Sequence, residues 1–162
     1  MGIARRPPPD VEELKEAYRE FIDGFRDRSG AKYRRAIEEM IEKGSRSLYI
    51  DFEDLRAFPR TRDLAIDLLL HPERHIEAAS EAVRDVALTY IGTGDPLEEI
   101  YVKYPFHARF RNLVETISIR KIPSYNLSRF VQVRGIVTRV SEVYSRVFRA
   151  VFVCSRCESE SE

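Results

Sequence analysis

Residues 130–140 read Phe-Val-Gln-Val-Arg-Gly-Ile-Val-Thr-Arg-Val, and this stretch decides the fold that we expect. Val131 and Val133 alternate with polar residues, as in a half-buried β-strand, whereas Ile136 falls on the opposite parity. A β-bulge at Gly135 would restore one continuous apolar face and let the strand bend. The stretch therefore predicts a bulged strand of a small β-barrel.

Other strand candidates surround this stretch in the second half of the chain. Together the candidates are 100–104, 116–122, 131–140 and 147–154, separated by proline- and serine-containing turns. With the bulge at Gly135, Arg134 and Arg139 lie on the same outward face of their strand. The residues before 92 have no such strand series.

The first half of the chain has a helical period instead. Asp10 and Glu13 have the spacing of a capping box after three prolines, which predicts a helix that runs to about Asp27. A second helix ends at Gly44, a third is capped by Thr61, and a fourth has Pro72 in its first turn. Between the second and third we expect a short strand at 47–50 and a helical turn at 51–55.

The turn Gly92-Thr-Gly-Asp-Pro96 separates these two halves, and the charge changes at the same point. Residues 101–157 carry eleven Lys and Arg against two acids, whereas the first hundred residues carry sixteen against twenty-two. A basic block of strands interleaved with Tyr, Phe and Val is typical of a surface that binds a polyanion such as nucleic acid. A solvated charged face is the alternative.

The composition excludes several classes of protein. No apolar run approaches the length of a membrane span, and residues 1–9 lack the apolar core of a secretory signal. Two cysteines three residues apart cannot hold a secreted fold together, so we expect a cytoplasmic protein without a membrane partner.

Cys154 and Cys157 form the sharpest local motif, directly after a predicted strand. Two thiolates at this spacing bind one edge of a tetrahedral zinc ion, but a structural site needs four ligands and no second pair follows. The motif therefore predicts half a zinc site. Inert thiols and a redox pair remain alternatives, although a thioredoxin-type role would require a βαβ unit.

No catalytic arrangement is predicted. His71 and His75 flank Pro72 and are expected at the surface, and His107 is expected in a loop. Lys43-Gly-Ser45 reverses the order of a phosphate-binding loop, so we expect no nucleotide cofactor and no ATPase. The chain is predicted not to be an enzyme.

Three stretches resemble the N-terminal region of archaeal minichromosome maintenance (MCM) replicative helicases. They are Ile119-Arg-Lys-Ile122, Phe130-Val-Gln-Val-Arg-Gly-Ile-Val-Thr-Arg-Val-Ser-Glu-Val143 and Ala150-Val-Phe-Val-Cys-Ser-Arg-Cys157. The order is similar too, because a helical region with a segment like Ser47-Leu-Tyr-Ile-Asp-Phe-Glu-Asp-Leu55 precedes them. The resemblance covers nearly all of the chain.

The resemblance implies a fold. The fold is α+β, with an N-terminal helical bundle over 1–92, a partial OB-fold of Greek-key type over 97–157 that ends in half a zinc-binding module, and an acidic tail over 158–162. The family's second ligand pair, later OB strands, DNA-contacting hairpin and ATPase domain are missing from this sequence. It therefore resembles an MCM N-terminal region truncated within the zinc module.

The resemblance also implies a function. The chain would be a non-catalytic DNA-binding and assembly module of a DNA replication helicase, with single- or double-stranded DNA as its partner. The expected contact residues are Arg120, Arg134, Arg139, Tyr144, Arg146 and Arg149. Arg139 matches a basic position of the family, whereas a second basic position is occupied by Tyr144. The alternative function is a protein-interaction module that pairs with MCM-type subunits, or with itself, and regulates ring assembly.

Overall fold

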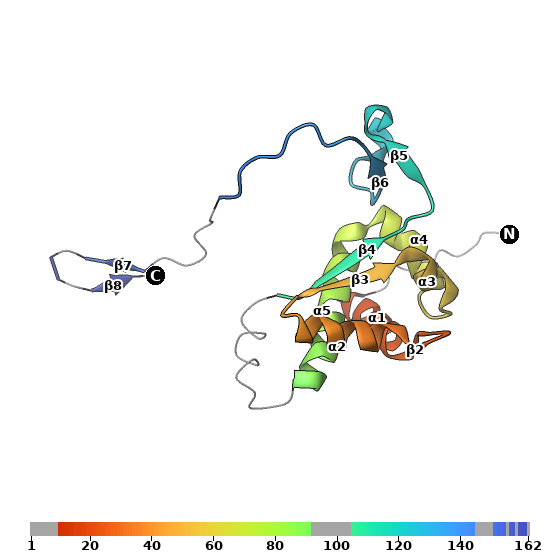
Figure 1. Cartoon of the computed structure of the whole chain (residues 1–162), viewed down its shortest axis with the longest axis horizontal. Coiled ribbons are helices and arrows are strands. Elements are labelled where there is room, and N and C mark those ends of the chain that lie inside the picture. The colour runs from red at the N-terminus through yellow and green to blue at the C-terminus, as the bar shows by residue number, and fades with distance from the viewer. Residues whose placement is uncertain (1–9, 92–104, 145–150, 155, 158, 162) are drawn as a thin grey trace.

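The computed structural model describes residues 10–91, 105–144, 151–154, 156, 157 and 159–161. Its helices and strands follow in the order α1 (Val11–Gly24), β1 (Arg26–Asp27), β2 (Gly30–Ala31), α2 (Lys32–Glu42), β3 (Ser47–Asp51), α3 (Phe52–Ala57), α4 (Arg62–Leu70), α5 (Pro72–Ile91), β4 (His107–Arg111), β5 (Thr116–Ser118), η1 (Ile119–Lys121), η2 (Ser124–Asn126), β6 (Gln132–Arg134), β7 (Phe152–Val153) and β8 (Glu160–Ser161). The helices gather with β3 and β4 in one unit, whereas β7 and β8 form a hairpin of their own (Figure 1).

The N-terminal helices begin where the sequence predicts. Helix α1 starts at Val11 because the Asp10 carboxylate accepts a hydrogen bond from the Val11 N–H at 2.7 Å. It ends at Gly24, three residues before the predicted end, and the chain turns into the β1–β2 hairpin. A Cβ atom at Gly24 would lie 3.3 Å from the Phe58 ring, so close packing favours glycine at this end.

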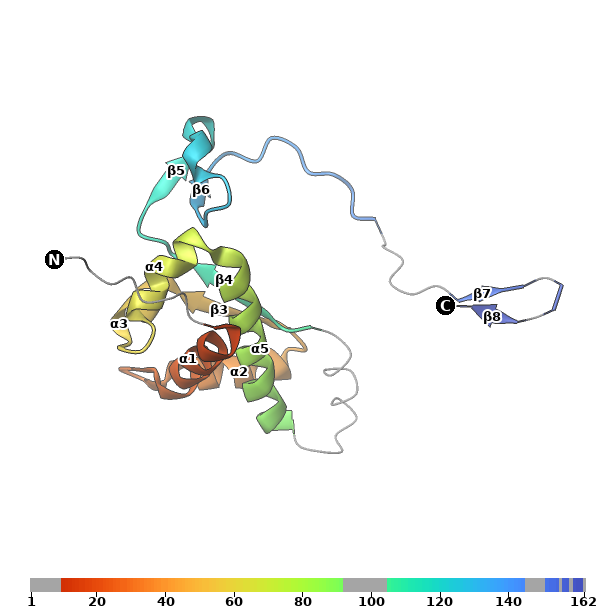
Figure 2. The same cartoon turned by 180° about the vertical axis from the view of Figure 1, so that it is seen from behind.

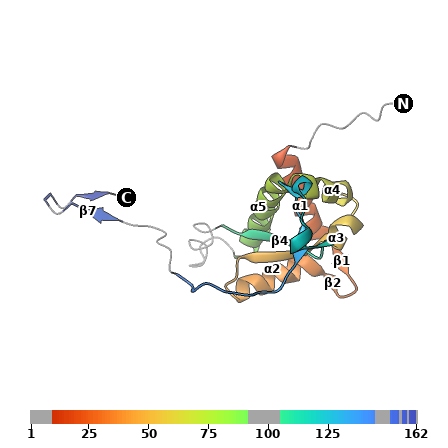
Figure 3. The ribbon, with the colours of Figure 1, turned by 90° about the horizontal axis from the view of Figure 1, so that it is seen from above.

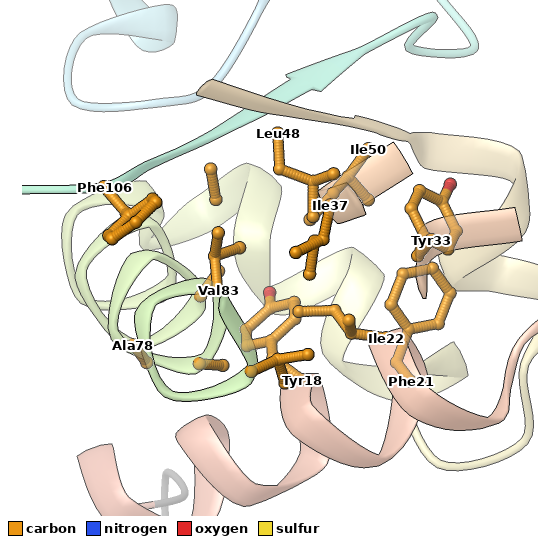
Figure 4. Packing of buried hydrophobic residues seen from close by; sticks show 14 of the residues in the cluster. Tyr18, Phe21, Ile22, Tyr33, Ile37, Leu48, Ile50, Ala78, Val83 and Phe106 are labelled. Carbon is orange, nitrogen blue, oxygen red and sulfur yellow. The ribbon is translucent and has the colours of Figure 1, made fainter. Parts of the chain in front are cut away.

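The core lies between the helices and the β3–β4 sheet, and α1 packs against α5 within it (Figures 2 and 3). Tyr18 and Phe21 of α1 point to the same interior as Val83 of α5 (Figure 4). The buried apolar set is Leu14, Tyr18, Phe21, Ile22, Tyr33, Ile37, Met40, Leu48, Ile50, Phe52, Leu55, Ala65, Leu68, Ala78, Ala79, Ala82, Val83, Val86, Ala87, Ile91, Phe106 and Ala108. Truncating one such aromatic costs about 3–5 kcal/mol, against at most about 1 kcal/mol for a surface ion pair, so packing determines the stability of this unit.

Strands β3 and β4 pair in parallel, with α3, α4 and α5 between them in the chain. The register runs from Ser47 opposite His107 to Asp51 opposite Arg111. Parallel neighbours need a long crossover connection, which the three helices supply. The prediction that His107 lies in a loop is therefore wrong. Only two apolar residues alternate in His-Ala-Arg-Phe-Arg, too few for the sequence pattern to indicate a strand.

Side chains from the helices cover the outer edges of this two-stranded sheet. The Ala108 N–H donates to the Ser80 hydroxyl at 3.0 Å, and the Asp51 N–H donates to the Tyr33 hydroxyl at 3.1 Å. An open strand edge is a template for pairing with another chain. At these two positions the backbone N–H of the edge already donates to a side-chain hydroxyl and cannot pair with an added strand.

The Asp51 carboxylate joins the carboxyl ends of both strands to α2. It accepts hydrogen bonds from Lys32 Nζ at 2.9 Å, Arg111 Nε at 2.9 Å and Asn112 Nδ2 at 2.6 Å. Burial opposes ionisation, but the hydrogen bonds from Arg111, Lys32 and Asn112 outweigh it and lower the pKa of Asp51 to about 2. Asp51 therefore remains charged throughout the physiological pH range.

His75 is fully buried, which corrects the prediction of a surface position. Asp67 can only accept when ionised, so His75 Nε2–H donates to it at 2.8 Å, and Nδ1 then accepts from the Tyr18 hydroxyl at 2.8 Å. Arg74 also donates to Asp67, at 2.7 Å. His75 lies on an otherwise apolar face of α5, and both of its ring nitrogens are hydrogen-bonded, one to Tyr18 of α1 and the other to Asp67 of α4. His71, at the end of α4, is exposed as predicted.

The strands of the second half are shorter than predicted. Strand β5 covers 116–118, because η1 replaces the rest of the expected strand, and β6 covers only 132–134 of 131–140. The two pair in parallel, with Thr116 opposite Gln132. The bulge expected at Gly135 does not form among the described residues, since residues 135–144 have no regular structure.

Four two-stranded sheets make up the β-structure of the described residues, β1–β2, β3–β4, β5–β6 and β7–β8. The chain is thus a mixture of helices and strands, as predicted, but no Greek-key barrel closes within the described part. Residues 92–96, 100–104 and 147–150, which bear on the predicted turn and strands, lie outside it.

We predict that the helical unit loses stability as pH falls below about 6.5. Burial lowers the pKa of His75, so as pH falls the unfolded chain takes up a proton near pH 6.5, before the folded chain does. The unfolded state then binds more protons, and the free energy of unfolding falls with pH. Urea unfolding at pH 7.5, 6.5 and 5.5 measures this.

His75→Gln should flatten this part of the pH profile, whereas His107→Gln, at an exposed histidine of β4, should not flatten it. A wild-type profile that is flat between pH 7.5 and 5.5 would contradict the prediction.

Candidate nucleic-acid interface

Two of the predicted contact residues meet beside β5 and β6. The register places Ser118 opposite Arg134, and Arg120 follows two residues later in η1. Both arginines line a shallow groove of about 830 Å³. Its lining is Thr116, Ser118, Ile119, Arg120, Arg134, Gly135, Ile136 and Thr138.

The lining of this groove suits an anionic, partly apolar ligand. The groove has two guanidinium groups and three hydroxyl groups, and no carboxylate lines it. Arginine donors and hydroxyl groups are the usual protein partners of phosphate oxygens. Ile119 and Ile136 are 60% and 91% exposed, which adds apolar surface to the same groove. The combination can bind a sugar-phosphate backbone without reading its sequence.

The arginines of this region are free to meet a ligand. Arg120, Arg134 and Arg139 are exposed, and no ion pair within the described part of the chain involves them. An arginine already paired with a carboxylate would have to break that pair before binding phosphate. These three arginines would not have to break an ion pair with a described residue before they bind phosphate.

Two other predicted contacts, Arg139 and Tyr144, are not among the residues that line the groove. Arg139 and Tyr144 lie in the irregular segment 135–144, where the Tyr144 hydroxyl approaches Glu142 at 3.5 Å. Arg146 and Arg149 lie outside the described residues. The predicted common face of Arg134 and Arg139 has no strand to support it, because β6 ends at Arg134.

Sequence reasoning missed a second basic surface, on β3 and β4. Tyr49, Arg109 and Arg111 alternate with core residues and point away from the core. The Arg111 guanidinium lies 5.7 Å from the centre of the Tyr49 ring. The parallel pairing of β3 with β4, which brings these residues together, has no local sequence signal.

Cys154 and Cys157 are exposed free thiols at the β7–β8 hairpin. The Cys154 N–H donates to the Ser159 carbonyl at 2.9 Å, and Cys157 Sγ lies 3.1 Å from the Ser159 hydroxyl. Hydrogen bonding to Ser159 lowers the pKa of Cys157 to about 7. No group of three or more His, Cys, Asp or Glu that could hold a metal occurs within the described ranges, and the half zinc site stays a prediction.

Comparison with known proteins identifies relatives of the whole chain. The model of the MCM N-terminal domain matches residues 15–130, and the model of the MCM OB domain matches residues 118–162. Both groove arginines lie within the second match. Among the described residues, no helix has the length and apolar character required to cross a membrane.

Individual relatives come from eukaryotes and archaea. DNA replication licensing factor mcm4 of Schizosaccharomyces pombe is 28% identical over 93% of this chain, and mcm3 of the same yeast is 32% identical over 75%. Minichromosome maintenance protein MCM of Saccharolobus solfataricus is 23% identical over 86%. The chain spans only 15%, 14% and 20% of their respective lengths. Because both kinds of organism are represented, an archaeal origin stays a prediction.

We predict that Cys157 reacts with iodoacetamide at neutral pH faster than an ordinary thiol. Its lowered pKa leaves about half of the thiol ionised near pH 7, and the thiolate is the reacting form. Alkylation of the unsubstituted chain from pH 5.5 to 9, followed by tryptic digestion at Arg156, which separates Cys157 from Cys154, and mass spectrometry, should give a midpoint near 7 for Cys157.

Ser159→Ala, in an otherwise unsubstituted chain, removes the hydroxyl beside Cys157 Sγ and should raise the midpoint. An unchanged midpoint would show that Ser159 does not stabilise the thiolate.

Proposed function

Because the chain belongs to the MCM N-terminal domain family, we propose that it is a DNA-binding and assembly module of a DNA replication helicase. In this proposal single-stranded DNA binds the groove beside β5 and β6. One observation carries the proposal: Arg120 and Arg134 converge on one carboxylate-free groove whose lining, apart from Thr116, lies within the residues that match the MCM OB domain.

The charge of the chain supports the same conclusion. The excess of Lys and Arg over acids is confined to residues 101–157, which contain the groove. When a protein binds nucleic acid without sequence preference, contacts to phosphate supply most of the affinity. The groove presents guanidinium and hydroxyl donors, the usual partners of phosphate oxygens, and no amide or carboxylate side chain lines it. We therefore expect weak binding with little sequence preference.

We propose that the module itself is not catalytic. Hydrolysis of a nucleotide needs a glycine-rich phosphate-binding loop, and no part of this sequence has that motif. Its role in a helicase would be to hold DNA and to contact neighbouring subunits.

The alternative function, a protein-interaction module for MCM-type subunits, is favoured by a different observation. Ile136, Val140 and Val143 are 91%, 79% and 99% exposed in the segment after β6. Such a run of exposed apolar side chains marks a surface that becomes covered by another chain or by further strands. A second copy of the chain or another subunit could cover it.

The cysteine pair would serve assembly if it holds zinc. Two chains could each contribute Cys154 and Cys157 to one Cys₄ site, which would couple metal binding to pairing of the chains. Within one chain the other ligands would be water or a distant histidine, and most of the affinity would be lost.

We predict salt-dependent binding to single-stranded DNA. If two to four phosphates are neutralised, log K falls against log salt with a slope of about −1.5 to −3, since each phosphate contributes about −0.7. Fluorescence anisotropy of a labelled oligonucleotide over a salt series measures the slope.

The double variant Arg120→Ala/Arg134→Ala should bind less tightly and make the slope less negative by about 1.4. Arg19→Ala, at an exposed position of α1, is the matched control and should bind like the unsubstituted chain. A signal that is absent at low salt, or independent of salt, would exclude the DNA-binding function.

We predict that a single chain does not retain stoichiometric zinc against EDTA at neutral pH, because it supplies only two thiolates. Elemental analysis after dialysis, with light scattering before and after zinc addition, measures this. One tightly held zinc per monomer would contradict the half site. One zinc per dimer, with doubling of the mass, would favour the assembly function.

A further inference from the structure

The outward side of the β3–β4 sheet carries an ordered set of side chains, which we call the β3–β4 face. The register pairs Ser47 with His107, Tyr49 with Arg109 and Asp51 with Arg111 across the two strands. The alternate residues Leu48, Ile50 and Ala108 are buried in the core, so the members of the face point to solvent.

Tyr49 is the centre of this face. Its side chain is 56% exposed, Arg109 lies directly across on β4, and Arg111 lies diagonally at 5.7 Å from the ring centre. Arg111 is in turn fixed by Asp51, which accepts from Nε at 2.9 Å and from a terminal nitrogen at 3.3 Å. The aromatic ring is thus exposed on β3, with Arg109 at the paired position of β4 and Arg111 beside the ring.

The balance of charge on the face selects an anionic ligand. Asp51 is the only acid in the three cross-strand pairs, and Lys32, Arg111 and Asn112 already satisfy it. Arg109 is exposed and forms no ion pair with any residue that the structure describes. The face therefore has an uncompensated positive charge next to an exposed ring.

The edges of the sheet argue against a peptide that binds as an added strand. Ser80 accepts from the Ala108 N–H on the β4 edge, and Tyr33 accepts from the Asp51 N–H on the β3 edge. A ligand must then contact the side chains of the face and not the backbone of the edge. An aromatic side chain on which bases stack, flanked by cations that meet phosphates, is how sheets bind single-stranded nucleic acid.

We propose that the β3–β4 face is a second contact surface for single-stranded nucleic acid, where a base stacks on Tyr49 and a flanking phosphate meets Arg109, while Arg111 stays paired with Asp51 beside the ring. The inference rests on the proposed function, that the chain binds single-stranded DNA, and assigns this surface in addition to the groove. Only residues 112–115 separate β4 from β5, so the backbones of Arg111 and Thr116 lie within about 18 Å of each other. One strand of DNA can reach both surfaces.

The test measures affinity and salt slope separately, by anisotropy of a fluorescein-labelled oligothymidylate. Tyr49→Ala should weaken binding about fivefold or more and leave the salt slope unchanged, because stacking involves no counterion release. Tyr49→Phe should bind like the unsubstituted chain, since the ring remains. Arg109→Ala should make the slope less negative by about 0.7, the value for one phosphate on a single strand.

Matched controls come from α5, away from this face. Tyr90→Ala and Arg84→Ala replace an exposed tyrosine and an exposed arginine and should change neither affinity nor slope. Circular dichroism melting verifies that each variant is folded. Photocrosslinking of an oligonucleotide that contains 5-iododeoxyuridine, with peptide mapping, should label the peptide that contains Tyr49.

The outcomes separate this inference from the proposed function. If Tyr49→Ala and Arg109→Ala bind normally while Arg120→Ala/Arg134→Ala loses affinity, the β3–β4 face is not a contact surface and the groove alone binds DNA. If the unsubstituted chain binds no DNA at low salt, both proposals are wrong. If these two substitutions weaken binding of a polyglutamate peptide but not of DNA, the face binds acidic peptides and the inference is overturned.

Discussion

The Asp51 carboxylate holds together three parts of the chain that no local signal would join. Its hydrogen-bond donors are Lys32 on α2, Arg111 at the end of β4 and Asn112 just beyond it. Without this anion, two cations would face each other where the parallel strands end. The interaction fixes the direction in which the chain leaves β4, and so it sets where β5 and the groove arginines begin. It also orients Arg111 beside Tyr49.

The helices could be predicted because their signals are local. Asp10, Gly44 and Pro72 mark ends that the structure reproduces, and apolar residues at helical spacing face the core. His75 was misjudged because its environment comes from Tyr18 and Asp67, which lie on other helices. Burial of a polar residue depends on tertiary partners, and the sequence of α5 alone contains none of them.

The candidate interface was predicted only in part, for a related reason. Residue type and charge were enough to select Arg120 and Arg134, but their meeting depends on the parallel pairing of β5 with β6. The expected strand around Gly135 assumed neighbours that would cover Ile136 and Val140. Within the described residues those side chains stay exposed. An apolar segment without a neighbouring strand lacks the packing that stabilises the extended conformation. The pairing of Tyr49 with Arg109 was missed because it spans two distant segments.

The position of β4 has a consequence for how the chain is made. Phe106 and Ala108 complete a core whose other members all come from residues 14–91. A nascent chain that has emerged from the ribosome only as far as α5 therefore lacks part of its interior and the partner of β3. Because contacts between distant segments form late, the helices would first collapse as a loose intermediate. The sheet can close only when residues 106–111 arrive, so we expect resistance to proteases to follow their emergence.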